Sequence, residues 1–211
     1  MKKEKDLIFK IKELLNSDIK TTVDRKIEEF EDMGKQDDKT LFLELCFCIL
    51  TANFQAERGI KIHAKIGEGF LTLNENQLAK KLKELGYRFP NTRASYIALA
   101  QQYQNKIRKI MESFDQETEL RDWLVKNIKG IGMKESSHFL RNTGYRNLAI
   151  IDFHILDLLE EHQLISRPKT MTKKKYLEIE EILQNIANLL NLNLAELDLY
   201  LWYVETGKIY K

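Results

Sequence analysis

Apolar residues return at intervals of three and four positions along much of this chain. The pattern covers residues 7–15, 41–49 and 96–107, and this spacing places the apolar side chains on one face of a helix. Only two prolines and nine glycines interrupt the 211 residues, which disfavours a β fold rich in turns. The sequence therefore predicts an all-α protein with about ten to twelve helices, most of them short.

The length and composition point to one compact unit. A chain of 211 residues is long enough to bury a sizeable core, and no Ser/Gly-rich linker or fixed repeat divides it. It shows no N-terminal run of signal-peptide type and no apolar stretch near the roughly 18 residues that a membrane span requires. We therefore expect a cytoplasmic protein.

Charge and cysteine content restrict the kinds of site that the chain can carry. The 34 basic and 32 acidic residues leave a net charge of +2, so a nucleic-acid site must be a local patch. Cys46 and Cys48 lie in an apolar run, too close for an ordinary disulfide and without companion ligands for zinc or an iron–sulfur cluster. We interpret them as buried thiols, and we expect no metal and no cofactor.

A helical pattern around residues 124–144 is interrupted by Gly130-Ile131-Gly132 and then resumes, which predicts helix, tight hairpin, helix. Glycine at Gly130 and Gly132 allows positive φ, while the amides that open the second helix point outward with the positive end of its dipole. Such a turn can hold a phosphate without side chains. Ile131 would anchor it between the helices, and Lys129 can add charge toward a DNA backbone.

Two residues downstream become informative in this context. The apolar run 148–151 ends at Asp152, and a helical pattern follows it, so Asp152 occupies an N-cap position. Taken alone, Asp152 would be an ordinary cap and Lys134 a solvated lysine near a helix start. Next to a hairpin that can bind DNA, both become candidates for catalysis.

The segment Lys-Gly-Ile-Gly-Met-Lys134, followed 18 positions later by Ile-Ile-Asp152-Phe-His-Ile-Leu, resembles the helix–hairpin–helix DNA glycosylase superfamily. Within it, the chain is most similar to the archaeal-type 8-oxoguanine DNA glycosylase/AP lyase family. The similarity also covers residues 44–54, 59–63, 85–89, 196–200 and 206–208, and so extends over essentially the whole chain.

The resemblance implies a two-lobed helical fold, with a single catalytic unit over residues 1–211 and the active site in the cleft between the lobes. The expected lobes are residues 1–35 plus 135–211, and residues 36–134. The implied substrate is damaged double-stranded DNA containing 8-oxoguanine, bound by a monomer. Two departures are visible: Phe153 stands where relatives usually carry Arg, and the iron–sulfur cysteines of some superfamily members are missing.

The implied chemistry assigns a role to each catalytic residue. The neutral amine of Lys134 attacks the sugar C1′, expels the base and forms a Schiff base that permits β-elimination of the 3′ phosphate. An ionised Asp152 stabilises the positive charge that develops on the sugar and can assist proton transfer. One lysine then serves both a hydrolase-type glycosidase activity and a lyase activity.

Further residues are candidates for DNA contact and for reading the base. Asn53 matches the position from which relatives insert an amide into the gap left by the flipped base, and Arg58 can contact phosphate. Phe89, Met133 and Trp202 are candidates for the base pocket, because aromatic faces stack on an extruded base. The alternative is that Asn53 and Arg58 belong to a solvated loop and helix face, and that the other three are core residues.

Other functions remain open at this point. A related glycosylase of endonuclease III type or of adenine specificity would use the same scaffold, although the missing cluster cysteines disfavour it. A non-catalytic helix–hairpin–helix module would use Lys134 only to contact phosphate. A helical scaffold without any DNA role would show no salt-sensitive affinity for DNA.

The C-terminal residue yields a test of base recognition. 8-Oxoguanine carries a hydrogen on N7 where guanine has a lone pair, and the resemblance implies that the terminus, here Lys211, helps to read it. A carboxylate would accept that hydrogen and repel guanine. Deleting Lys211, or appending residues after it, should reduce excision of 8-oxoguanine far more than cleavage at a preformed abasic site. Equal excision by intact and truncated protein would show a frayed terminus instead.

Overall fold

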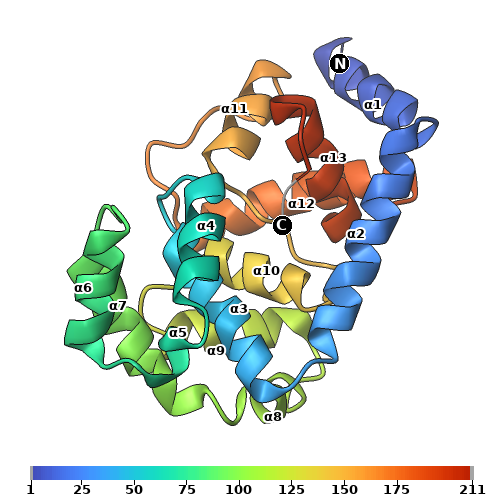
Figure 1. Cartoon of the computed structure of the whole chain (residues 1–211). Coiled ribbons are helices and arrows are strands. Elements are labelled where there is room, and N and C mark those ends of the chain that lie inside the picture. The colour runs from blue at the N-terminus through green and yellow to red at the C-terminus, as the bar shows by residue number, and fades with distance from the viewer. Residues whose placement is uncertain (1, 210–211) are drawn as a thin grey trace. The chain divides into compact units, whose positions relative to one another are not determined.

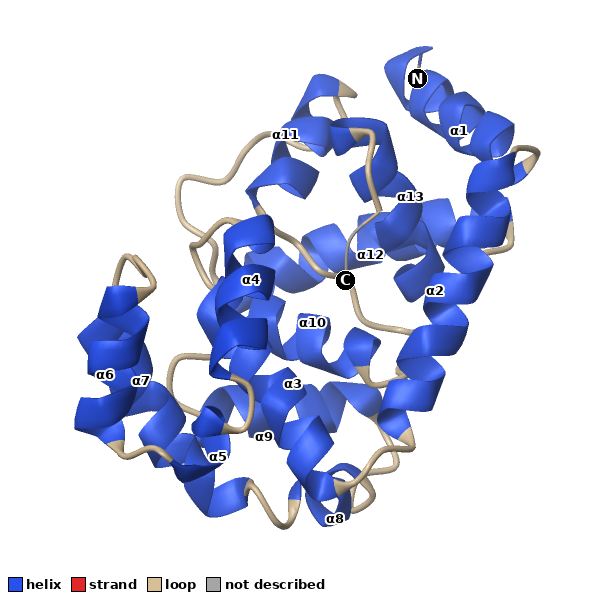
Figure 2. Cartoon of the chain, viewed as in Figure 1, coloured by secondary structure: helices blue, strands red, loops and turns tan. Residues whose placement is uncertain are grey.

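In the part of the chain that the computed structural model describes, residues 2–209, every regular element is a helix (Figures 1 and 2). The predicted all-α class is confirmed. No helix of this part is long and apolar enough to cross a membrane. The helices are α1 (Lys2–Leu15), α2 (Asp18–Gly34), α3 (Asp38–Thr51), α4 (Ala56–Ile66), α5 (Gly69–Thr72), α6 (Glu75–Glu84), α7 (Pro90–Ala100), η1 (Gln101–Tyr103), α8 (Ile107–Met111), α9 (Glu117–Asn127), α10 (Met133–Asn142), α11 (Phe153–Glu161), α12 (Lys173–Leu190) and α13 (Leu194–Thr206).

The chain forms two compact units. Residues 33–143 make up one, here called the central unit, and residues 1–32 with 144–211 make up the other, the terminal unit. The expected lobe boundary at 134/135 would have divided α10, but the whole helix lies in the central unit, where it packs on α3 and α9. The first boundary, expected at 35/36, lies at 32/33.

Helix α3 forms the core of the central unit. Its N-cap Asp37 accepts a hydrogen bond from the amide of Thr40 at 2.9 Å, and nearly every residue from Leu41 to its end is buried. Cys46 and Cys48 are free and buried, as predicted, and burial raises the pKa of the Cys46 thiol well above its usual value. Helices α4, α5, α7, α8 and α10 all contact α3, so it fixes their positions.

A buried polar contact joins α10 to α3. Asn142 donates from Nδ2 to Glu44 at 2.6 Å, and its Oδ1 accepts two hydrogen bonds from the Arg141 guanidinium. All three side chains are at most 5 % exposed. Buried polar groups are costly unless they are paired, so this contact tolerates only one arrangement of the two helices.

The single helix predicted from the pattern over residues 96–107 is wrong. Helix α7 ends at Ala100, a 3-10 turn follows, and α8 begins only at Ile107. The Gln101 side chain donates to the carbonyls of Phe70 and Leu73, both at 2.9 Å, and Leu99 is 48 % exposed. Long-range bonds to the short helix α5 and its C-cap therefore override the local periodicity. The short helices α5 and α8 also bring the described α-helices to thirteen.

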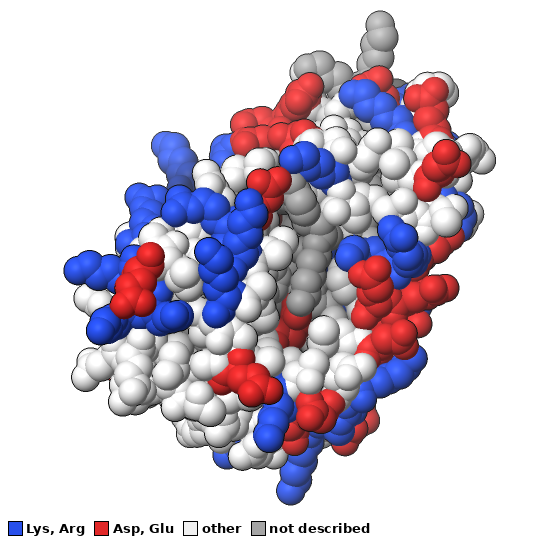
Figure 3. Space-filling model, viewed as in Figure 1, with Lys and Arg blue, Asp and Glu red and all other residues white. Residues whose placement is uncertain are grey.

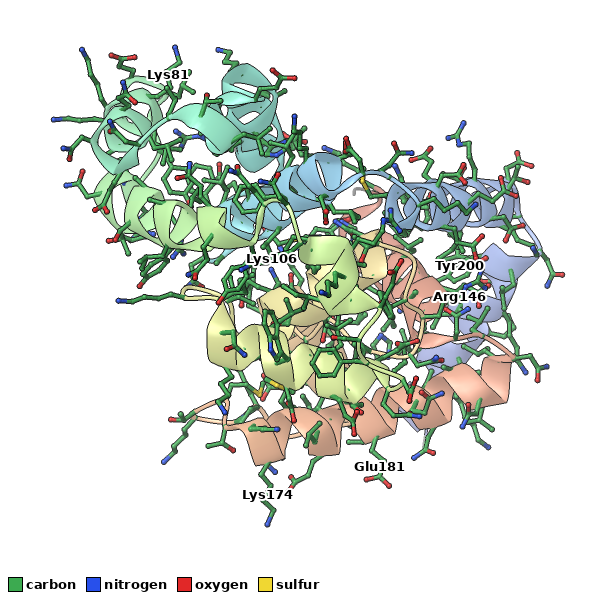
Figure 4. The ribbon with its side chains drawn as sticks, turned by 90° about the horizontal axis from the view of Figure 1, so that it is seen from below. Lys81, Lys106, Arg146, Lys174, Glu181 and Tyr200 are labelled. Carbon is green, nitrogen blue, oxygen red and sulfur yellow. The ribbon has the colours of Figure 1, made fainter. Side chains whose placement is uncertain are left out.

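In the terminal unit, α13 packs on α1, α11 and α12. Helix α12 is amphipathic: Lys174 and Glu181 project outward from it in Figure 4, while Tyr176 and Leu183 on the opposite side are buried. Its N-cap Thr172 accepts from the amide of Lys175, and it ends at Asn191 with left-handed φ of 55°. The buried face of α12 supports the segment that leads to Asp152.

Candidate active site and DNA-binding surface

The hairpin lies in the central unit, as the sequence predicts. Helix α9 ends at Asn127, the chain turns through residues 128–132, and α10 begins at Met133. Gly130 has a φ of +89°, which only glycine adopts readily. Ile131 is 6 % exposed, so its side chain anchors the turn while the flanking glycines stay near the surface.

Gly130 is also required because of its neighbour Tyr96 on α7. A β-carbon at position 130 would overlap with the Tyr96 ring. The Lys129 ammonium lies 5.8 Å from the centroid of the same ring, and Lys129 is exposed. The ring of Tyr96 therefore supports the hairpin from below and leaves the charge of Lys129 available to a phosphate.

The expectation of positive φ at Gly132 is wrong. Its φ of −103° and ψ of −168° are those of extended backbone, and its amide donates to the Glu135 carboxylate at 3.1 Å. Gly132 is the N-cap of α10, and Glu135 satisfies one of the amides that a helix start leaves unpaired. Gly132 has no side chain that could accept from the first turn, so the amides of Met133, Lys134 and Glu135 are those that remain for an anion.

Lys134 is the second residue of α10 and is partly buried, as is Met133 immediately before it. Lys134 therefore stands in the first turn of the helix that follows the hairpin, next to the amides at the start of that helix.

Asp152 lies in the terminal unit and is the N-cap of α11, as predicted. Its Oδ1 accepts from the amide of Ile155 at 3.0 Å. The preceding residues are held by α12: the Tyr176 hydroxyl donates to the Ala149 carbonyl at 2.6 Å and accepts from the amide of Ile151 at 3.2 Å. Glu180 accepts from the amide of Ala149 at 2.8 Å. Four hydrogen bonds thus fix the carboxylate and the backbone before it.

Three aromatic rings, those of Phe153, His154 and Trp202, contact one another in the terminal unit. The exposed Phe153 ring lies 4.0 Å from that of His154, and His154 meets the Trp202 indole edge-on at 4.9 Å between centroids. His154 Nδ1 is 3.8 Å from a Glu205 carboxylate oxygen. The Trp202 Nε1 is buried and makes no hydrogen bond to any residue between 2 and 209. These contacts hold Trp202 close to α11, on which Asp152 is the cap.

The remaining predicted residues are exposed on the central unit. Asn53 follows α3 with φ of 56°, Arg58 is in the first turn of α4, and Phe89, 41 % exposed, precedes α7. The Arg58 guanidinium donates to the Gly86 carbonyl at 2.8 Å, which brings its loop and that of Phe89 together. Lys211 lies outside the described residues.

Comparison with known proteins decides the family. A family model described as 8-oxoguanine DNA glycosylase matches residues 23–192. The chain belongs to this family.

Members of the 8-oxoguanine DNA glycosylase family match this chain over nearly its full length. The 8-oxoguanine DNA glycosylase/AP lyase of Methanocaldococcus jannaschii is 55 % identical over 206 residues, covering 97 % of this chain and 99 % of the relative. The enzyme of the same name from Korarchaeum cryptofilum is 48 % identical over 207 residues, covering 98 % of each.

Solved structures of family members share the fold. The crystal structure of the M. jannaschii 8-oxoguanine DNA glycosylase superposes with a TM-score of 0.95, at 55 % identity, covering 99 % of this chain and 97 % of that one. A second crystal structure, of the M. jannaschii enzyme in complex with 15mer DNA containing 8-oxoguanine, gives 0.94 at 55 % identity and covers 97 % and 99 %. The Thermotoga maritima 8-oxoguanine DNA glycosylase gives 0.91 at 41 % identity and covers 98 % and 99 %.

Sequence reasoning about this family member missed the residues that support the site. Tyr96, Tyr176 and Glu180 make the contacts described above but stand in no motif. His154 stands in the quoted segment after Asp152, yet the sequence assigned it no role. A tyrosine at a position that helical periodicity places in the core is the one available signal, because a buried hydroxyl needs a partner. The identity of that partner depends on the tertiary fold.

The two hairpin glycines should respond differently to alanine. Gly130→Ala combines a left-handed φ, costing about 1–2 kcal/mol, with an overlap with Tyr96, and should weaken affinity for duplex DNA about tenfold. Gly132→Ala is the matched control, since its backbone is extended and its β-carbon would lie 3.2 Å from a Glu135 side-chain oxygen, which would have to shift by only a few tenths of an ångström. Fluorescence anisotropy with a labelled duplex measures both. Equal losses would contradict the roles assigned to the two glycines.

Proposed function

We propose that this chain excises 8-oxoguanine from duplex DNA and cleaves the resulting abasic site by β-elimination, with Lys134 as the nucleophile and Asp152 as its electrostatic partner. The observation that carries the proposal is membership of the 8-oxoguanine DNA glycosylase family over residues 23–192. The position of Lys134 at the helix start that follows a glycine hairpin supports its role.

Charge on the central unit supports DNA as the substrate. Helices α4 and α6 carry six exposed basic residues, Arg58, Lys61, Lys65, Lys80, Lys81 and Lys83. Figure 3 shows that basic side chains gather over these two helices, although the whole chain has a net charge of only +2. The local patch expected from the balanced composition is thus present, and it suits a phosphate backbone.

The proposed reaction balances with two residues. The Lys134 amine adds to C1′ as the bond to the base breaks, and the base departs with a proton of that amine. The C1′–O4′ bond then breaks as O4′ takes up a proton from solvent, which leaves a protonated Schiff base between Lys134 and C1′. Loss of a proton from C2′ expels the 3′ phosphate, and water finally hydrolyses the Schiff base and returns the Lys134 amine. Asp152, whose carboxylate is held by the Ile155 amide, faces the developing positive charge and lowers its energy.

In the proposal, four residues recognise the base: Phe89, Met133, Trp202 and Lys211. The buried indole N–H of Trp202 supports a polar role for that residue, because a buried donor without an acceptor is rare unless a ligand completes it. All proposed groups belong to one chain, which suits action as a monomer. The proposed place of action is the cytoplasm, with access to the chromosome.

Removing the amine tests the nucleophile. Lys134→Gln should bind a duplex containing 8-oxoguanine with nearly unchanged affinity but break neither the glycosidic nor the phosphate bond, because the amide side chain cannot form a Schiff base. Borohydride should trap the wild-type protein covalently on the damaged DNA and fail to trap the variant. A wild-type protein that binds but is never trapped would instead indicate a non-catalytic hairpin module.

Removing only the negative charge tests Asp152. Asp152→Asn keeps the N-cap, since asparagine caps about as well as aspartate, and should lower the single-turnover rate of base release by about 100-fold or more. Asp37→Asn is the matched control, because Asp37 caps α3 with the same geometry. Quenched-flow measurement of base release compares them. Wild-type rates in Asp152→Asn would leave Asp152 as a cap only.

A further inference from the structure

Two loops of the central unit are joined into one element. The α3–α4 loop, residues 52–55, and the α6–α7 loop, residues 85–89, together are called the double loop here. The ring of Phe54 packs on that of Tyr87, with 4.4 Å between centroids. Arg58, in the first turn of α4 just after the first loop, donates to the Gly86 carbonyl in the second loop at 2.8 Å. The loops are therefore in contact through side chains on both sides.

Arg93 lies beneath the double loop and bonds to both halves. It is on α7 and only 8 % exposed. Its Nη2 donates to the Ala52 carbonyl at 2.6 Å, and its Nε donates to the Tyr87 hydroxyl at 3.3 Å. The planar guanidinium fork fixes the direction of each bond, which a lysine ammonium cannot do.

The Tyr87 hydroxyl completes the connection to the core. It donates to the Leu50 carbonyl in the last turn of α3 at 2.5 Å and accepts from Arg93. Tyr87 is 4 % exposed, and its burial raises the pKa of the hydroxyl, which keeps it a donor. The hydroxyl thereby ties the second loop to the helix from which the first loop emerges.

The side chains that leave the double loop point to solvent. Asn53, next to the anchored Ala52 carbonyl, is exposed with left-handed φ of 56°. Phe89, two residues after Tyr87, is 41 % exposed, and the Arg88 guanidinium lies 4.8 Å from its ring centroid. The buried Arg93 guanidinium thus supports the loops that carry the exposed amide of Asn53 and the exposed ring of Phe89.

We propose that Arg93 and Tyr87 are positioning residues that hold Asn53 and Phe89 in one fixed arrangement toward the duplex, so that Asn53 is ready to occupy the space that an extruded base leaves. This rests on the proposed function. Extruding a nucleotide breaks its base pair and its stacking, and this costs free energy that the contacts of the protein with DNA must offset. If the loop becomes ordered only on binding, part of that binding free energy is spent on ordering it. Burying the Arg93 guanidinium costs free energy, and the effect of this burial is that the double loop is fixed.

The proposal predicts that losing the anchor affects paired lesions most. Arg93→Met and Tyr87→Phe keep most of the buried volume but remove the bonds to Ala52 and Leu50. Each variant should slow single-turnover release of 8-oxoguanine opposite cytosine about tenfold. Opposite a tetrahydrofuran abasic analogue, with which 8-oxoguanine forms no base pair, each variant should slow release by no more than about twofold. The double variant should be slower than either single variant by less than the product of the two effects, because both single variants lose the Arg93–Tyr87 bond.

Arg121→Met is the matched control. Arg121 is 1 % exposed on α9 and donates to Ser137 on α10, so any effect of losing this buried guanidinium should be the same on both duplexes. Circular dichroism melting confirms that each variant is folded, and Tyr87→Phe alone decides if Arg93→Met does not fold.

Equal slowing of both duplexes by Tyr87→Phe, or no slowing, would overturn the proposal and leave Arg93 and Tyr87 as core residues. A folded wild-type protein that releases no 8-oxoguanine from either duplex would overturn the proposed function itself.

Discussion

The contact between Gly130 and the ring of Tyr96 constrains the rest of the central unit. The turn can pass over α7 only because no β-carbon stands at position 130, and this passage sets where α10 begins. The first turn of α10 carries the backbone amides suited to a phosphate and, at its second position, Lys134. A contact between two residues that perform no chemistry therefore determines the place of the proposed nucleophile.

Each unit supports its part of the proposed site in the same physical way. In the terminal unit, side chains of α12 hold the segment before Asp152 through its backbone groups. In the central unit, a side chain of α7 holds the Ala52 carbonyl. Loops that carry function are usually mobile. Here the backbone groups of the loops are hydrogen-bonded to side chains of helices, and this restricts the loops without adding secondary structure. Asp152 and Asn53 therefore lie on backbone segments whose conformation is restricted.

Sequence alone predicted what local rules decide. The hairpin, the cap at Asp152 and the buried cysteines follow from glycine spacing, capping preference and apolar context, and the structure confirms them. The break after Ala100 was missed because it depends on Gln101 bonding to carbonyls about thirty residues away. Gly132 was misjudged because a glycine's residue type does not reveal which φ the turn requires, and Glu135 supplies the cap instead.

Burial of Cys46 and Cys48 inside α3 has a consequence for the conditions under which this protein works. They are its only cysteines, both are fully buried, and the raised pKa of Cys46 disfavours the thiolate form. Peroxides and disulfides react with exposed thiolates far faster than with buried thiols. 8-Oxoguanine accumulates when oxidants are abundant, and under those conditions neither thiol is exposed to the agents that create the lesion.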